Sequence, residues 1–326
     1  MQRAIPIRAG CMQTSVNSAS LTNGIPAVSL PSIETLQARL DSLDKIPSVP
    51  TILLPLTRNL DQPVAAIDVR KITELISYDE SIAAQCLRIA NSPLFGRWQN
   101  VDSIHAAVMA LGITRVRDIA MSCCLLSLLP QQCGCIDPRA FWEHSLAVAM
   151  VSRRLARRIE FKNTEKAYLA GLLHDVGIVA NLLTFPDEFR ETAKAALSQR
   201  LPLHEVEPEY LSFTHSVSGS FLADRWHLTA DLNEVIRRHH DPEHATVYRS
   251  LTALVNIADL VCRKCGLGYG YNETKKPALL ESPAWPILAS ECTAVNTFGA
   301  ARFASEMDMY ANEVRRLVGV LFRLDR

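Results

Sequence analysis

The sequence predicts an all-α protein, because helical hydrophobic periodicity and helix-capping residues recur along most of its 326 residues. Glycine is scarce, at 13 residues, and the alternating β-branched runs that are typical of strands are absent. Hydrophobic residues make up 48% of the chain, which is enough for a large buried core. From the usual length of a domain, we predict two helical subdomains.

The N-terminal subdomain is predicted to follow a disordered tail. Residues 1–30 are rich in Ser, Thr, Asn and Gly and lack sustained periodicity, which is typical of a tail of this kind. Residues 31–135 then contain five amphipathic segments with cap or breaker residues. These are "SIETLQARLDSL" capped by Ser32, "DVRKITELISYD", "ESIAAQCLRIANSPLFG" closed by Pro93 and Gly96, "SIHAAVMALG" from Ser103 to a left-handed C-cap at Gly112, and "ITRVRDIAMSCCLLSLLP" up to Pro130.

The second subdomain is predicted to begin after the break "QQCGCIDPR" and to span residues 136–265. Pro138 suits the first turn of "PRAFWEHSLAVAMVSRRLARRIE", and Asn163 is the expected cap of one helix, "TEKAYLAGLLHDVGIVANLLTF". Further helices are expected at residues 186–200, 213–227, 231–240 and 243–264. Residues 266–326 complete the chain with a loop at 266–285 and a last amphipathic helix at about 294–324.

Charge and composition exclude several functional classes. Lys+Arg and Asp+Glu are balanced at 34 each, so no global field favours nucleic acid or a membrane surface. The local basic patches "RVRD" and "SRRLARR" are explained as solvated helix faces. We expect no membrane span and no secretory signal. The nine cysteines are scattered, which favours reduced thiols and a cytoplasmic location.

Ionisable residues interrupt several apolar helix faces, most clearly at His174 and Asp175 in "AGLLHDVGIVANLL". A buried ionisable group is costly unless it is paired or binds a metal, and imidazole and carboxylate groups are transition-metal ligands. Adjacent helical residues project about 100° apart, so this doublet can converge on one ion only at a cleft between helices. The other candidates are His144 in "FWEHSLAVAM", His215 in "SFTHSVSGSFL", His239 and His240 in "VIRRHHDP", and Asp259 in "LVNIADLV".

Each candidate also has a purely structural interpretation. A single histidine on an apolar face is usually a hydrogen-bonded core residue, and His239 and His240 could lie exposed before a turn. Asp259 could pair with Arg263, four residues further on. The doublet is the hardest to explain in this way, because two polar groups are buried together.

These residues resemble a known family. His144, "LLHDVG" thirty residues later and the distant Asp259 resemble the HD superfamily of metal-dependent phosphohydrolases. The more specific similarity is to its HDOD branch, the HD-related output domains of bacterial signalling proteins, and it covers about residues 43–264. It is carried by "IPSVPTILLPL", "ISYDESIAAQCLRIANSPLFG", "DSIHAAVMALGITRVRDIAM", "FWEHSLAVA", "YLAGLLHDVG", "FTHSVSGSFLADRW" and "VIRRHHDP".

The resemblance implies an HD-like helical core preceded by an N-terminal helical subdomain. It also implies a role in bacterial signal transduction or gene regulation, as an output or scaffolding module without established enzymatic activity. The superfamily's metal ligands would correspond to His144, His174, Asp175 and Asp259, with His215, His239 and His240 as candidate extra ligands. A divalent transition metal is therefore the only cofactor expected.

The chain departs from the related cyclic-dinucleotide phosphodiesterases. In that branch the doublet is followed by Gly-Lys, and the Lys contacts substrate phosphate, whereas here Gly177 is followed by Ile178. "HHDPEH" lacks that branch's Gly-Tyr-Pro loop, and the later "GLGYGYN" is given no role because it lies in the wrong place. We predict a non-enzymatic module that acts on other signalling proteins, without nucleic acid or membrane partners. The alternative is a metal-dependent phosphohydrolase, and the oligomeric state stays open.

Overall fold

The computed structural model describes residues 30–43, 55, 68–92, 101–126, 136–269, 273, 274, 279–297 and 299, and single residues beyond them at 303, 306, 311, 312, 315 and 316. Within these residues every regular element is an α-helix or a 3₁₀ helix and no strand occurs, which confirms the all-α prediction. The expected tail, the break between the subdomains and most of the last helix lie outside the described residues.

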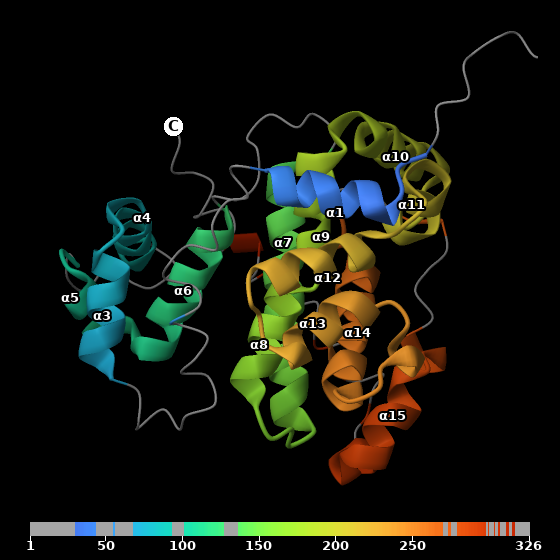
Figure 1. Ribbon diagram of the computed structural model, residues 1–326. Helices are drawn as coiled ribbons and strands as arrows, with labels where there is room; N and C mark the ends of the chain where they lie inside the picture. Colours follow the sequence, from blue (N-terminus) through green and yellow to red (C-terminus); the bar gives the residue numbers. More distant parts are fainter. Residues whose placement is uncertain are drawn as a thin grey trace, which may run out of the picture. The chain divides into compact units, whose positions relative to one another are not determined.

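Four helices form the N-terminal group, in which α6 contacts each of the other three (Figure 1). They are α3 (Val69–Ser77), α4 (Glu80–Ala90), α5 (Ile104–Leu111) and α6 (Ile113–Leu126). Ser103 caps α5 as predicted, by accepting a hydrogen bond from the Ala106 amide. The predicted left-handed cap at Gly112 is wrong: with φ 84° and ψ 152°, the residue extends the chain directly into α6.

The helix α1 (Ile33–Ser42) contacts α9 and α12 of the second group. Ser32 caps it as expected, accepting from the Thr35 amide. Two arginines attach it: Arg39 donates to the Thr184 carbonyl at 2.6 Å, and Arg225 donates to the Leu40 carbonyl at 2.7 Å. Helix α1 is thereby joined to the helices that carry the polar cluster.

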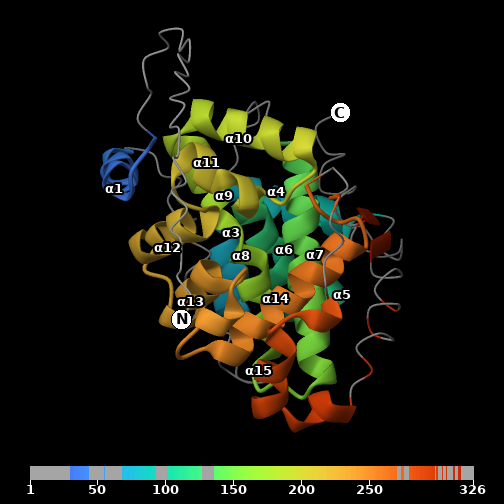
Figure 2. The ribbon, with the colours of Figure 1, turned by 90° about the vertical axis from the view of Figure 1, so that its right-hand side faces the viewer.

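The second group is built around the long helix α7 (Pro138–Arg158), which contacts α8 (Thr164–Leu173) and α14 (Arg249–Lys264) along its length (Figures 1 and 2). Pro138 at the start of α7 and Asn163 as the α8 cap match the sequence prediction. Helix α9 (Val176–Thr184) packs against α12 (His215–Arg225), which contacts α13 (Ala230–Arg238) in turn. The candidate ligands lie on these helices and their junctions.

Several boundaries differ from the prediction, mostly at prolines. Helix α10 (Pro186–Gln199) is as expected, but α11 (Leu203–Leu211) contains Pro208 and was not predicted. Pro242 begins the 3₁₀ turn η3 (Pro242–His244), so α14 starts at Arg249 rather than at 243. The predicted 266–285 loop contains η4 (Leu279–Glu281) and the start of α15 (Ala284–Glu291). The prolines at the start of α15 are tolerated because the amides of the first helical turn need no helical hydrogen-bond partner. Where the last helix was expected to begin, the structure has the 3₁₀ helix η5 (Thr293–Thr297).

The single helix predicted from residue 164 to 185 is wrong, because the chain turns at His174 and Asp175 between α8 and α9. Taken together, Thr164–Thr184 is long and apolar enough to cross a membrane by length and composition, contrary to the sequence expectation. However, 94% of its most apolar window is buried inside the structure. This stretch is the centre of the helical core.

Two glycines allow α9 and α12 to meet backbone to backbone. A Cβ atom on Gly177 would lie 1.8 Å from the His215 carbonyl oxygen and 2.6 Å from the Gly219 nitrogen. A Cβ atom on Gly219 would in turn lie 3.0 Å from the Gly177 nitrogen. Because Asp175 directly precedes α9 and His215 begins α12, this close crossing brings the two polar residues together.

Replacing Gly177 with alanine should separate α9 from α12 and destabilise the protein. Overpacking costs about 1–3 kcal/mol, and we expect the upper end because the clash is with backbone. Urea unfolding of the Gly177→Ala variant measures this loss. The control is Gly268→Ala, where a Cβ atom would meet nothing within 4 Å. Equal unfolding free energies for the two variants would contradict the close-crossing account.

Candidate metal centre

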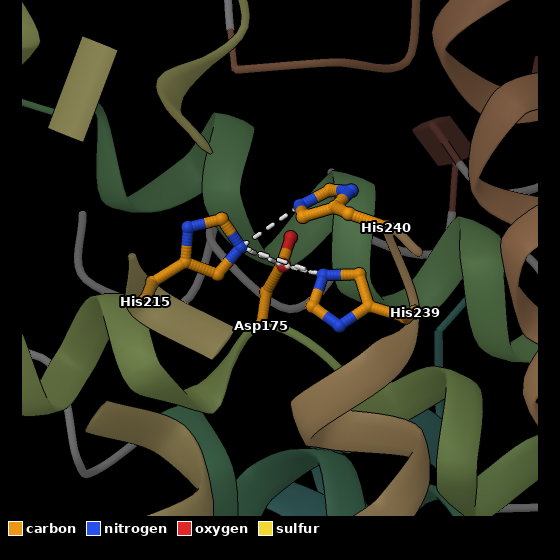
Figure 3. A group of neighbouring side chains, drawn as sticks. All are labelled: Asp175, His215, His239 and His240. Atoms are coloured by element: carbon orange, nitrogen blue, oxygen red, sulfur yellow. Dashed lines mark hydrogen bonds and ion pairs between the residues drawn. The ribbon is translucent and has the colours of Figure 1, made fainter. Parts of the chain in front are cut away.

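All seven candidate residues identified in the sequence converge in the second group of helices. Their side chains come from α7, the α8–α9 turn, the start of α12, the residues after α13, and α14; they are His144, His174, Asp175, His215, His239, His240 and Asp259. Six of them are no more than 2% exposed, and the side chain of His240 is 17% exposed. Figure 3 shows three of the histidines around Asp175.

The Asp175 carboxylate lies at the middle of the cluster, with two imidazole nitrogens facing each oxygen. Oδ2 is 3.3 Å from Nε2 of His144 and 3.0 Å from Nε2 of His174. Oδ1 is 3.1 Å from Nε2 of His215 and 3.2 Å from Nε2 of His239. The carboxylate thus joins two pairs of histidines that belong to different helices.

The potential ligand atoms fall into two adjacent groups. One consists of Asp175, His215, His239 and His240, and the other of His144, His174 and Asp259; within each group the ligand atoms lie within 4.8 Å of one another. Asp175 Oδ1 belongs with the first group, while its Oδ2 contacts both histidines of the second. A carboxylate placed between two such groups has the position that sharing by two metals would require.

Hydrogen bonds on the far side of each ring fix the orientation of the four central imidazoles. Nδ1 of three histidines donates to a backbone carbonyl, and Nδ1 of His215 donates to the Glu207 carboxylate. The bonds are His144 to Leu267 at 2.7 Å, His174 to Gly171 at 2.8 Å, His239 to Ile236 at 2.9 Å, and His215 to Glu207 at 2.8 Å. With the proton on Nδ1, the Nε2 lone pair of a neutral ring points toward the centre, as in metal-binding histidines.

A cation satisfies this arrangement better than the side chains do alone. When all four rings are neutral, their Nε2 lone pairs and the Asp175 oxygens are all acceptors, and they face one another in a buried space. With neutral rings, Asp175 Oδ1 receives no hydrogen bond from any residue that the structure describes. An unsatisfied buried polar atom is costly, and a bound cation removes that cost. The imidazole and carboxylate donors therefore fit a divalent transition metal.

The pKa shifts of Asp175 and His215 also favour a cation at this site. Burial opposes ionisation of Asp175, but the neighbouring side chains of His174, His144 and His215 hold the pKa of its carboxyl well below the usual range. Burial alone would lower the pKa of His215, but the Glu207 and Asp175 carboxylates outweigh it and raise that pKa to about 10. In metal-free protein, His215 therefore carries a proton that a metal must displace, so metal affinity should rise with pH.

The structure also shows contacts that the sequence analysis missed. Glu207 is fully buried on α11, where it accepts from the His215 amide at 2.7 Å and from Asn181 at 3.2 Å. Its helical spacing from the apolar Leu203 and Leu211 was the available signal. Tyr269, in the "GLGYGYN" stretch that was given no role, donates a hydrogen bond to Asp175 Oδ2.

The interpretation that Asp259 pairs with Arg263 is also correct, at 3.4 Å. Arg263 binds Glu273 as well, at 2.6 Å. The Asp259 carboxylate is therefore both a neighbour of His144, with Oδ1 3.4 Å from Nε2, and one side of an ion pair. The ion pair with Arg263 is confirmed, and the role of Asp259 as a metal ligand stays a prediction.

Comparison with known proteins gives a consistent family assignment. The model of the HDOD domain family matches residues 46–242. The crystal structure of an HDOD domain protein with unknown function from Geobacter sulfurreducens is 27% identical, has a TM-score of 0.74, and aligns over 89% of this chain and 98% of that chain. An uncharacterized protein of Treponema pallidum (strain Nichols) is 25% identical over 225 residues, which are 68% of this chain. The chain spans 43% of the length of that curated relative.

Two more distant structures share the fold. A protein from Marinobacter aquaeolei VT8, provisionally named a signal transduction protein, is 20% identical with a TM-score of 0.69 over 88% of this chain and 65% of that chain. A protein from Shewanella amazonensis SB2B, provisionally named a phosphohydrolase, is 20% identical with a TM-score of 0.63 over 88% of this chain and 98% of that chain.

Removing the carboxylate that orients His215 should weaken metal binding. Changing the hydrogen-bond partner of a metal ligand typically costs 10- to 100-fold in affinity, and we expect a loss of about this size in Glu207→Gln. A competition titration of zinc against a chelator measures it. The matched control is Glu209→Gln, an exposed position on the same helix, which should bind like the wild type. Unchanged affinity in Glu207→Gln would show that Glu207 does not orient a ligand.

Proposed function

The chain belongs to the HDOD domain family, and on that premise we propose that it is a non-enzymatic regulatory module with a metal centre at its core. The centre would hold up to two divalent transition-metal ions, with Asp175 shared between them. The metal would stabilise the helical core, and the output would pass through contacts with other signalling proteins.

The observation that carries this proposal is the burial of the candidate ligand set among the residues that the structure describes. Six of the seven ligands are buried, and the ring of His204 stacks on the most exposed one, His240, with centroids 3.7 Å apart. Burial, with Arg263 nearby, lowers the pKa of His204 to about 3, so this covering ring is neutral. Ile178, at the position of the phosphodiesterase lysine, is fully buried in the core. A phosphate ester would therefore find no cation at that position.

A buried ion-pair network supports communication between the metal core and the N-terminal helices. Arg117 on α6 is 1% exposed and lies 2.5 Å from Glu165 on α8. Arg153 on α7 lies 2.7 Å from Asp118 on α6. Breaking a buried ion pair is strongly destabilising, so α6 is firmly attached to the helices that position His144 and His174. A structural change at the metal centre would therefore be transmitted to the N-terminal group of helices, where partners would dock.

The second candidate function is a metal-dependent phosphohydrolase. One observation favours it: a carboxylate shared by two adjacent groups of ligand atoms is an arrangement that can hold two metals and activate a water molecule for attack on phosphate.

Metal analysis and hydrolysis assays distinguish these functions. We expect purified protein to bind up to two metal ions per chain and to hydrolyse neither cyclic dinucleotides nor bis(p-nitrophenyl) phosphate. Asp175→Asn should lose the metal and melt at a lower temperature. The control Asp187→Asn changes a carboxylate that is 84% exposed and should do neither. Metal-dependent turnover that disappears in Asp175→Asn would overturn the proposal and establish the phosphohydrolase.

A further inference from the structure

Residues that follow α14 contact two candidate ligands directly and a third through Arg263. The Leu267 carbonyl accepts from Nδ1 of His144, and the Tyr269 hydroxyl donates to Asp175 Oδ2. Two hydrogen bonds of 2.9 and 2.6 Å then connect Glu273 to Arg263, the ion-pair partner of Asp259. The first of these contacts explains the orientation of His144, but the ligand set described above does not explain why a phenol reaches the bridging carboxylate.

The phenol ring of Tyr269 is held in place on its apolar side. Its centroid lies 4.9 Å from that of His144, and it stacks on Phe141 at 6.5 Å with an interplanar angle of 18°. Leu267, two residues earlier, is buried. The ring is thus fixed by packing, and its oxygen is directed at Oδ2, the atom that also faces Nε2 of His144 and His174.

The position of this oxygen matters for the coordination of a metal. The group of His144, His174 and Asp259, together with Asp175 Oδ2, offers four donor atoms. Metal sites that act on substrates keep a further position for water or a substrate oxygen. The Tyr269 oxygen contacts the shared carboxylate oxygen, so it lies within reach of a metal bound by this group.

We propose that Tyr269 is an internal ligand of the metal centre and takes the position that water or a phosphate oxygen would otherwise occupy. This inference rests on the proposed function and gives a chemical reason for the absence of turnover. On metal binding, the metal replaces the phenol proton, which leaves to solvent. The Arg263–Glu273 ion pair and the 2.9 Å hydrogen bond from the Thr274 amide to the Arg200 carbonyl keep the segment against the centre.

Ferric iron is a suitable probe, because a phenolate ligand gives ferric iron a visible charge-transfer band that imidazole and carboxylate ligands do not give. The full chain would be stripped with a chelator, reloaded with iron, and its iron content and visible spectrum recorded. We expect a coloured wild-type protein and a Tyr269→Phe variant with the same iron content but no band. Tyr248→Phe removes a phenol oxygen outside the cluster and should keep the band.

A second measurement tests whether Tyr269 occupies an exchangeable position. In cobalt-loaded protein, inorganic phosphate should bind Tyr269→Phe about tenfold or more tightly than the wild type, a change of the size that follows loss of a supporting contact at a metal site. The spectral shift of cobalt on titration with phosphate gives both dissociation constants. Equal constants would show that Tyr269 does not block the position.

The results separate this inference from the proposed function. Wild-type protein that binds iron without a visible band, or a band that persists in Tyr269→Phe, would overturn the assignment of Tyr269 while leaving the metal centre in place. Wild-type protein that binds neither iron nor cobalt would overturn the metal centre and the inference together. Iron-loaded wild-type protein without a band contradicts the inference even if the Tyr269→Phe variant does not fold.

Discussion

The burial of the Asp175 carboxylate is the constraint on which the rest of the core depends. A carboxylate removed from water needs compensating charge, and here four imidazole nitrogens from four elements supply the surroundings. To bring them together, the chain turns between α8 and α9, and Gly177 meets the backbone of α12 directly. A bound metal would supply the positive charge that this geometry requires. In metal-free protein, the protonated His215 supplies positive charge beside Asp175 instead.

The supporting contacts are as specific as the ligands. Glu207 orients His215, and Leu267 orients His144 through its carbonyl. These two contacts come from segments far apart in the sequence, so the centre ties α11 and the end of α14 to the middle of the bundle. The ion pairs of Arg117 and Arg153 extend the connection to α6. In the proposed regulatory module, a metal bound here would hold the core in one conformation.

The sequence predicts most of the helices and the clustered polar residues because both leave local signals. Caps such as Ser103 and Asn163 depend on neighbouring residues, and His174 and Asp175 stand out within an apolar run. The missed features depend on contacts across the fold. The helix that carries Glu207 was not predicted because it contains Pro208. Tyr269 lies in a glycine-rich stretch, and its hydrogen-bond partner, Asp175, is 94 residues away in the sequence. The turn between α8 and α9 was missed because the apolar pattern continues through it.

The most direct test of this account is anomalous X-ray diffraction from crystals of the metal-loaded protein, recorded on both sides of the metal absorption edge. The account predicts a strong anomalous peak within about 2.0–2.2 Å of an Asp175 oxygen and of the Nε2 atoms that face it. With both ligand groups filled, a second peak should lie on the other side of the same carboxylate. Crystals of metal-loaded protein that show no anomalous peak between these side chains, or a peak elsewhere on the chain, would contradict it.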